Sequence, residues 1–217
     1  MARFPLPNGA ILEVASGFGA AVPFTAITNA APPVVTAAGH ALTNNEVVLI
    51  DSGWGGIADR AAKVAAAATD SFSLAGLDTS NADTYTPGSG LGSVIPVSNW
   101  LEIPKITSLA VAGGEQQYLT LGYLAEDADR QMPTNRNPLT MTITVEDQPA
   151  LAYVTVVEGL SDAKTLSILR LKLRNGDQIL YPGYVSISDT PTTERNALMT
   201  RTISVGIAGR PMRYLAA

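Results

Sequence analysis

The amino-acid sequence predicts a mainly β protein of antiparallel strands forming a sandwich or barrel, with one flanking α-helix and an inserted small β-barrel. Three observations predict this class. Apolar and polar side chains alternate with a period of two along several segments of the last third of the chain. Turn-forming residues are abundant, with 19 Gly and 14 Pro among 217 residues. Long runs with helical periodicity are few. A chain of this length can bury a substantial core.

The clearest pattern lies in residues 165–213. Leucines alternate with basic side chains over residues 169–174, which places the two kinds on opposite faces of a strand. The sequence Asn-Gly-Asp at 175–177 is typical of a tight hairpin turn. Residues 179–187 continue the alternation on the return strand, and residues 198–208 supply a third strand. We expect a three-stranded antiparallel unit on which the remainder of the chain is built.

The N-terminal third changes character at residue 30. One short strand is expected at residues 10–15, followed by a Gly/Ala-rich arm that has no core of its own. Beyond it, short apolar segments alternate with turns, which predicts a small barrel. The expected strands are residues 34–37, 46–51, 61–66, 71–74 and 84–86. Residues 61–68 also fit a short helix by propensity, but we favour a strand.

Proline and glycine clusters bound this small barrel, with Pro32-Pro33 before it and a Gly-rich stretch at 87–93 after it. The sequence therefore predicts two domains: a main domain of residues 1–29 and 96–217, and an inserted barrel of residues 30–95. Because such joints separate independent units, we expect that a chain lacking residues 31–94 still folds and assembles.

The main domain resumes with strands expected at 102–109, 117–124 and 140–145. Between the last two lies a long polar loop, residues 125–138, at the tip of a hairpin. We expect a helix over 148–158, because Glu146-Asp147 can cap its start and Gly159 can end it.

Charge is distributed unevenly along the chain. Residues 30–95 hold six acidic against two basic side chains (−4), residues 98–162 nine against three (−6), and residues 164–217 three against eight (+5). Neutralisation within one fold explains this asymmetry, and so does head-to-tail contact between subunits. On the second interpretation, Arg195, Arg201 and Arg210 are candidate inter-subunit contacts, and reversing their charge should weaken assembly more than the fold.

The residues that carry catalysis or bind metals are scarce. The chain has no cysteine and a single histidine, His40, so thiolate sites, His-rich metal sites and a His-based triad are excluded. The acidic residues near 126–129 lack the spacing of a calcium loop, and the glycines at 88–92 precede no helix that could bind phosphate. We expect no catalytic residue, no metal, no cofactor and no enzymatic activity. No apolar run is long enough to span a membrane.

Three motifs carry a family resemblance. Residues 181–186 (YPGYVS) and 200–211 (TRTISVGIAGRP) follow the basic strand and the turn, EDAD stands at 126–129, and GAILEV opens the chain at 9–14. In this order they resemble the tail tube proteins of long-tailed, non-contractile bacteriophages, over residues 1–28 and 98–213. Residues 30–95 resemble the small SH3-like barrels that recur in phage structural proteins.

The resemblance implies a structural function. Six subunits would form a ring, and rings would stack into the hollow tail tube that conducts the double-stranded DNA genome without binding it specifically. Implied partners are further copies of the chain and the tape measure, tail terminator and distal tail proteins, in a virion tail assembled in the host cytoplasm. In such a stack, the loop carrying Asp127, Asp129, Arg130 and Arg136 would contact the next ring. The alternative is a tail-surface binding module that uses the barrel of residues 30–95 to contact a receptor or carbohydrate.

Overall fold

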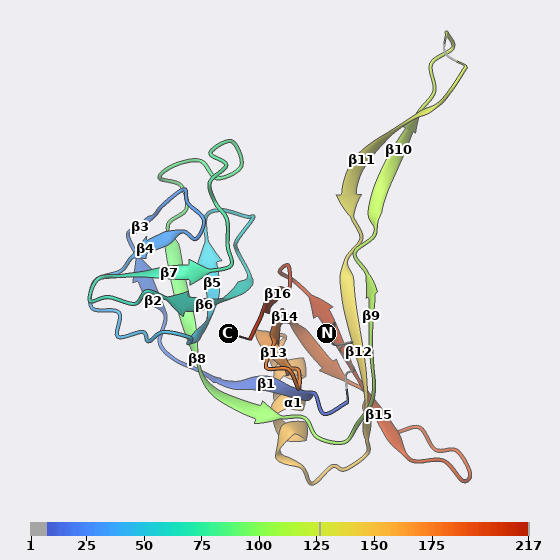
Figure 1. Cartoon of the computed structure of the whole chain (residues 1–217). Coiled ribbons are helices and arrows are strands. Elements are labelled where there is room, and N and C mark those ends of the chain that lie inside the picture. Colours follow the sequence, from blue (N-terminus) through green and yellow to red (C-terminus); the bar gives the residue numbers. More distant parts are fainter. Residues whose placement is uncertain (1–7, 126, 217) are drawn as a thin grey trace.

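The computed structural model describes residues 8–125 and 127–216, which form sixteen strands and one helix (Figure 1). Residues 1–7 of the predicted main domain lie outside the described residues, and so does Glu126 of the EDAD motif. The elements are β1 (Ile11–Phe18), β2 (Val22–Phe24), β3 (Ala26–Ile27), β4 (Val34–Thr36), β5 (Val47–Ser52), β6 (Arg60–Ala65), β7 (Ser71–Ala75), β8 (Gly92–Glu102), β9 (Ile106–Gly113), β10 (Gln116–Leu121), β11 (Arg130–Arg136), β12 (Leu139–Glu146), α1 (Ala152–Ala163), β13 (Leu166–Lys172), β14 (Gln178–Ile187), β15 (Thr200–Ile207) and β16 (Met212–Tyr214).

Fourteen strands belong to one antiparallel sheet, and β10 and β11 form a separate pair. The order in the large sheet is β3-β4-β7-β6-β5-β8-β1-β13-β14-β15-β12-β9, with β16 beside β14 and β2 beside β8. The mainly β class with antiparallel strands and a single helix is therefore confirmed.

The C-terminal unit forms as the sequence predicts. Strands β13, β14 and β15 are consecutive neighbours in the sheet, with Leu169 opposite Tyr181 and Val185 opposite Val205. The turn between β13 and β14 uses Gly176 at φ +91°, a backbone conformation that glycine adopts without strain. The alternation also places side chains as expected, because Ile203 and Val205 of β15 are buried.

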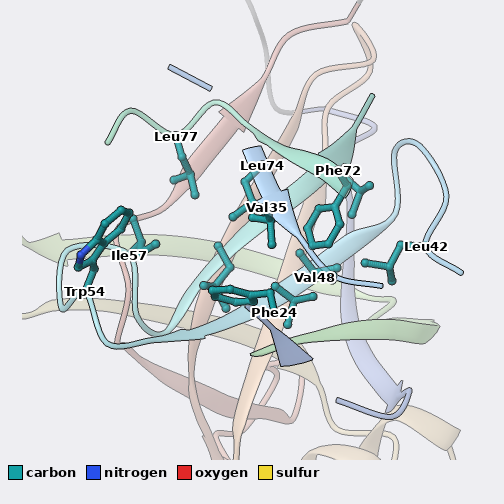
Figure 2. Close-up of a cluster of buried hydrophobic side chains, with 14 of the residues drawn as sticks. Phe24, Val35, Leu42, Val48, Trp54, Ile57, Phe72, Leu74 and Leu77 are labelled. Atoms are coloured by element: carbon teal, nitrogen blue, oxygen red, sulfur yellow. The ribbon is translucent and has the colours of Figure 1, made fainter. Parts of the chain in front are cut away.

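Strands β2 to β7 and the first half of β8 surround a hydrophobic core (Figure 2). Four of the strands predicted within residues 30–95 are found within one residue at each end, and the segment at 60–65 is a strand and not a helix. The strand predicted at 84–86 is wrong. The amide of Tyr85 donates to the carbonyl of Asn81, so this segment is a turn that lays the Tyr85 ring edge-on to Trp54.

The Gly/Ala-rich segment that follows the first strand of the chain packs on this barrel. Strand β2 pairs with β8, β3 pairs with β4, and Phe24 enters the barrel core. The sequence showed no period-two pattern here because each strand is only two or three residues long.

The second core lies between α1 and the sheet strands β1, β12, β13, β14 and β15. The helix is real but runs later than predicted, from Ala152 to Ala163, with Gly159 inside it. The expected cap is absent: Leu151 occupies the N-cap position without a side-chain hydrogen bond, and Lys164 ends the helix in a left-handed conformation. Tyr153, Val154 and Val157 are buried, so packing against the sheet outweighs local cap signals and β-branched residues.

The strand predicted at 102–109 is wrong in part: Glu102 ends β8 and residues 106–109 belong to β9, but residues 103–105 separate the two strands. The amide of Ile103 still bonds the carbonyl of Leu12 in continuation of the β8–β1 pairing, and the chain then turns at Lys105, which has φ +58°. In contrast, β8 runs without interruption from residue 92 to 102 across the domain boundary expected at 95/96. A single strand thus belongs both to the small barrel and to the main sheet.

A third core cluster joins the two parts. Val47, Leu49 and Ala61 from the barrel pack against side chains of the main sheet, among them Ile168 and Leu180, which are both fully buried. The barrel therefore contributes core side chains to the main sheet.

The C-terminal strand β16 also binds the barrel, which the sequence analysis did not anticipate. Met212 lies in the barrel core, and the Tyr214 hydroxyl donates to the carbonyl of Ala75 and accepts from the amide of Lys63. Arg213 pairs with Asp177 at 2.6 Å. Hydrogen bonds from Arg213 and from a backbone amide lower the pKa of Asp177, so this contact stabilises the fold at neutral pH and is lost when acid protonates the carboxylate.

Candidate functional site

The most exposed feature of the chain is a two-stranded arm, residues 114–138, which we call the arm (Figure 1). It consists of β10 and β11 with the turn between them, and it continues the β9–β12 hairpin away from the body. The junction requires glycine: Gly113 and Gly114 have φ +88° and +80°, and a Cβ at Gly113 would lie 2.0 Å from the carbonyl oxygen of Pro138. The arm therefore leaves the sheet at a defined bend.

The long polar loop predicted at 125–138 is wrong in part, because residues 130–136 form β11. All seven of its residues are exposed, so no apolar face marks it in the sequence. Pro133 is tolerated because β11 has a strand partner on one side only among the described residues. Of the predicted loop, residues 125, 127–129, 137 and 138 form no strand among the described residues, and the first four lie at the tip of the arm (Figure 1).

Large apolar side chains cover the arm although none of the core clusters includes them. Tyr118, Leu119, Tyr123 and Met132 are each more than half exposed, and Leu124 is fully exposed. Tyr118 and Leu119 are successive residues of β10, so they point to opposite faces. Isolated two-stranded ribbons are marginally stable in water, and exposed apolar patches mark surfaces that bind another molecule. The arm has the composition of a docking element.

The structure places the four predicted stacking residues on this arm. Asp127 and Asp129 lie in the tip, whereas Arg130 and Arg136 stand at the two ends of β11, about 20 Å apart at strand spacing. Arg136 donates to the side chain of Gln116 across the arm. The apolar side chains of the arm were missed, although the spacing of Tyr118 and Tyr123 around a run without charge is visible in the sequence.

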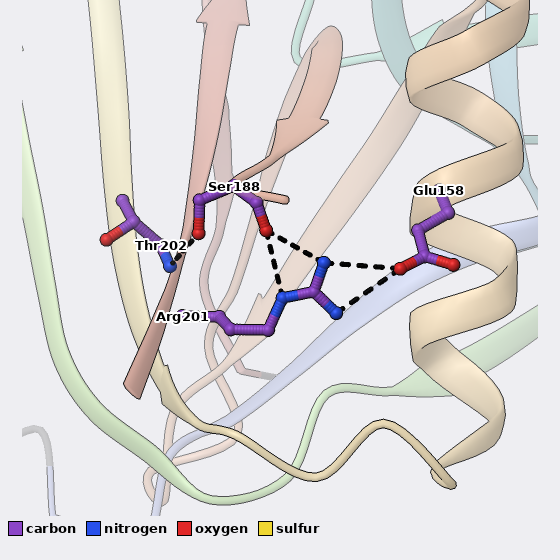
Figure 3. Close-up of polar contacts among 4 residues, drawn as sticks. All are labelled: Glu158, Ser188, Arg201 and Thr202. Carbon is purple, nitrogen blue, oxygen red and sulfur yellow. Dashed lines mark hydrogen bonds and ion pairs between the residues drawn. The ribbon is translucent and has the colours of Figure 1, made fainter. Parts of the chain in front are cut away.

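The three predicted inter-subunit arginines are not brought together. Arg195 is exposed in the loop between β14 and β15, and Arg210 is exposed between β15 and β16 beside the small barrel. Arg201 is buried and bonded inside the subunit (Figure 3). Its guanidinium donates to the carbonyl of Ser188 at 2.7 and 2.9 Å and to Glu158 of α1 at 3.2 Å.

The Arg201 contacts predict a structural effect. Replacing Arg201 by Met should lower the free energy of unfolding by about 1–3 kcal/mol, because the partly buried carbonyl of Ser188 loses a charged donor. Chemical denaturation measures it. The matched control, Arg195→Met in the exposed loop, should change stability by less than about 0.5 kcal/mol. Equal stability of both variants would show that Arg201 is available for contacts outside the subunit.

On the face of the main sheet opposite α1, the part formed by β9, β12, β15 and the end of β14 is uncovered and almost free of charge, whereas the part formed by β1, β8 and β13 carries Glu13, Glu102, Arg170 and Lys172. Opposite the α1 side, β12 exposes Thr140 and Thr142, with Ser204 and Gly206 beside them on β15 and Ala110 and Ala112 on β9. Tyr184 and Ser186 of β14 extend this uncovered part. Along β12, the carboxylate of Glu146 at the end of the strand is the first charged group. Toward β13, the small barrel covers the same face through Leu180 and Ile168. We call the exposed part the neutral face.

Residue types that bind metals do not cluster. Within residues 8–125 and 127–216, no group of three or more His, Asp or Glu side chains is placed to hold an ion. His40 is buried in its turn, where its ring accepts from the amide of Leu42 and stands edge-on to Phe72. No helix in the described part of the chain is long and apolar enough to cross a membrane.

A projecting arm with exposed apolar side chains is typical of proteins that bind another molecule at that surface. The family model of the phage tail tube protein matches residues 52–216. The chain therefore belongs to the phage tail tube protein family, a family of structural proteins of phage particles. A search of curated proteins finds no match.

Solved structures show partial likeness. The tail of an empty gene transfer agent particle, solved with C6 symmetry, is 9% identical with a TM-score of 0.42, over 55% of this chain and 89% of the other. The virion of a native gene transfer agent particle is 7% identical with a TM-score of 0.42, over 53% of this chain and 88% of the other. The tube-terminating cap of the anti-feeding prophage is 17% identical with a TM-score of 0.38, over 53% of this chain and 83% of the other.

Proposed function

We propose that copies of this chain associate into rings, six subunits to a ring, and that the rings stack into the hollow tail tube through which the phage genome passes. Membership of the tail tube protein family supports this function. The single observation of the structure that carries it is the arm, whose exposed apolar side chains have no cover within the subunit. Another copy of the chain is the partner that every subunit of a polymer meets.

The arm is suited to contacts between rings. It extends from one end of the β9–β12 hairpin, and its tip lies far from the body (Figure 1). Burying Tyr118, Leu119, Tyr123 and Met132 on a neighbour would contribute about 1.5–3 kcal/mol for each side chain, before the cost of ordering the arm. This contribution is large enough to make assembly depend on the arm.

Strand β9 is a candidate for the contacts between neighbouring subunits of one ring. It is the last strand of the large sheet, paired with β12 on one side and with no other strand of the described chain. Free strand edges promote pairing with another chain. Addition of a neighbour's strand at β9 would extend the sheet around the ring and would remove the open edge.

The neutral face is suited to the channel wall. Basic side chains bind DNA phosphates and release counterions, so a wall without them lets a duplex slide. Hydroxyl and alanine side chains, such as Thr142, Ser204 and Ala110, satisfy this requirement. Double-stranded DNA would pass along this face without specific binding, and the protein would act without catalysis or cofactor.

The position of the neutral face can be tested because the chain has no cysteine. In assembled tubes, Thr142→Cys should react with a small maleimide and not with a maleimide coupled to a globular protein too large for the channel. Asp83→Cys, on an exposed loop of the small barrel, is the control and should react with both. Rapid reaction of Thr142→Cys with the large reagent would place the neutral face on the outside of the tube.

The other parts of the proposal follow from the family resemblance. The partners would be the tape measure, tail terminator and distal tail proteins, and assembly would take place in the host cytoplasm before the tail joins the virion. We retain as a proposal the division into a main domain (residues 1–29 and 96–217) and an inserted barrel (30–95) that stands on the tube.

Electron microscopy of the purified protein at rising concentration tests the function. Rings and then tubes about 100 Å wide, a few domain diameters, are expected. A protein that stays monomeric at high concentration, in low and in physiological salt, would contradict the proposal.

A further inference from the structure

A basic cavity lies where the C-terminal segment meets the small barrel. It has a volume of 350 Å³ and is lined by Arg60 from β6, Asp78 after β7, and Arg210, Met212 and Arg213 from the C-terminal segment. Three arginines and one aspartate therefore contribute to the lining of one concavity, and the guanidinium of one of them, Arg213, is already paired with Asp177. No part of the function described above uses this cavity.

Two of the three arginines have no carboxylate partner in the described chain. Arg213 pairs with Asp177, but Arg60 donates only to the carbonyl of Gly56 and the sulfur of Met212, and its buried Nε has no hydrogen-bond partner there. Arg210 is exposed and forms no ion pair within the described residues. Burial lowers the pKa of Arg60, Tyr85 raises it, and the positive charge of Arg210 lowers it, as expected for two guanidinium groups close enough to repel one another. An anion in the cavity would relieve this repulsion.

We propose that this cavity receives the carboxylates of Asp127 and Asp129 at the arm tip of another copy of the chain. The inference deepens the proposed function and rests on it. Both carboxylates are exposed and form no ion pair within the described chain. The cavity is concave and the tip protrudes, so shape and charge are complementary.

Apolar groups complete the match. Leu124, which is fully exposed near the tip of the arm, can pack against Pro211, which lines the cavity. The pairing also explains why the segments of opposite charge are kept apart within one subunit: the negative tip is carried away from the body, and the positive cavity is left open.

A charge exchange tests the pairing. Arg210→Glu and the double variant Asp127→Lys, Asp129→Lys should each raise the protein concentration needed for tubes at least tenfold in low salt, because each places like charges in contact. The variant that combines all three substitutions should form tubes at a lower concentration than either parent variant, because the carboxylate introduced at position 210 again faces opposite charge, but Arg60 and Arg213 of the cavity keep the recovery partial. Arg174→Glu, an exposed turn position, is the control for net charge and should assemble normally.

A cross-link gives an independent measurement. Tubes of the variant Asp127→Cys, Arg210→Cys should form disulfides between copies on oxidation and give a ladder of linked chains on a denaturing gel. The control Asp127→Cys, Arg174→Cys should remain single chains.

The outcomes separate the inference from the proposed function. Wild-type tubes with no rescue by charge exchange and no ladder would overturn the pairing and leave the tube function intact. Calorimetric binding of inorganic phosphate to the monomer that Arg210→Glu abolishes, again without rescue, would assign the cavity to a free anion and would also overturn it. A wild-type protein that forms no tubes would overturn both.

Discussion

Deleting the arm should abolish tube formation and leave a folded subunit. Residues 116–136 can be replaced by Gly-Ser, because the flanking residues Glu115 and Asn137 already bond to each other through the Asn137 amide at 3.0 Å. No arm residue belongs to a core cluster, so the melting temperature should change by only a few degrees. Size-exclusion chromatography and electron microscopy measure assembly, and circular dichroism measures the fold.

A substitution variant distinguishes the loss of the arm's apolar contacts from the loss of the arm's length. An arm with Tyr118, Leu119, Tyr123 and Met132 replaced by Ser keeps its strands and its charges but loses the apolar surface. It should fail to assemble as the deletion does. In the wild type, amide hydrogens of β10 and β11 should exchange rapidly in the monomer and slowly in tubes. Tubes formed by the deletion variant, or equal protection in both states, would refute the role of the arm.

Excising the small barrel should unfold the main domain. Removal of residues 31–94 uncovers Ile168, Leu180 and Val97 and leaves Met212 and Tyr214 without the groups they pack on. At about 1.5–3 kcal/mol for each side chain, the loss is about 8–15 kcal/mol, comparable to the whole stability of a domain. The Pro/Gly joints of the sequence predict the opposite result, a folded and assembling remainder.

The arm deletion is the matched control for this excision, because it also removes a continuous segment but takes no core residue. Far-ultraviolet circular dichroism and thermal unfolding of the two variants give the comparison. A cooperative transition near the wild-type temperature after barrel excision would show that the shared core contributes little, and would support the boundary at 95/96.

Strands with one buried face could be predicted from the sequence. Met141, Ile143 and Val145 of β12 alternate with threonines, and the structure buries all three. Strand β11 could not be predicted, because both of its faces are exposed and no alternation results. The start of α1 was misplaced because Tyr153, Val154 and Val157 are held by the sheet and not by a local cap.

The candidate site shows the same limits. The position of Asp127 and Asp129 at a hairpin tip follows from flanking strands and was predicted. The burial of Arg201 depends on Glu158 and Ser188, which are 43 and 13 residues away in the chain, and local pattern does not report such contacts. Strand β16 is three residues long and packs on a barrel some 150 residues upstream, so it too needed the structure.

A cryo-electron microscopy reconstruction of tubes grown from the purified protein tests the central claim most directly. The account predicts a hollow tube in which each arm lies against a subunit of the adjacent ring and the neutral face, around Thr142 and Ser204, lines the channel. Arms that project free into solvent in a fully formed tube, or a channel lined by other strands, would contradict it.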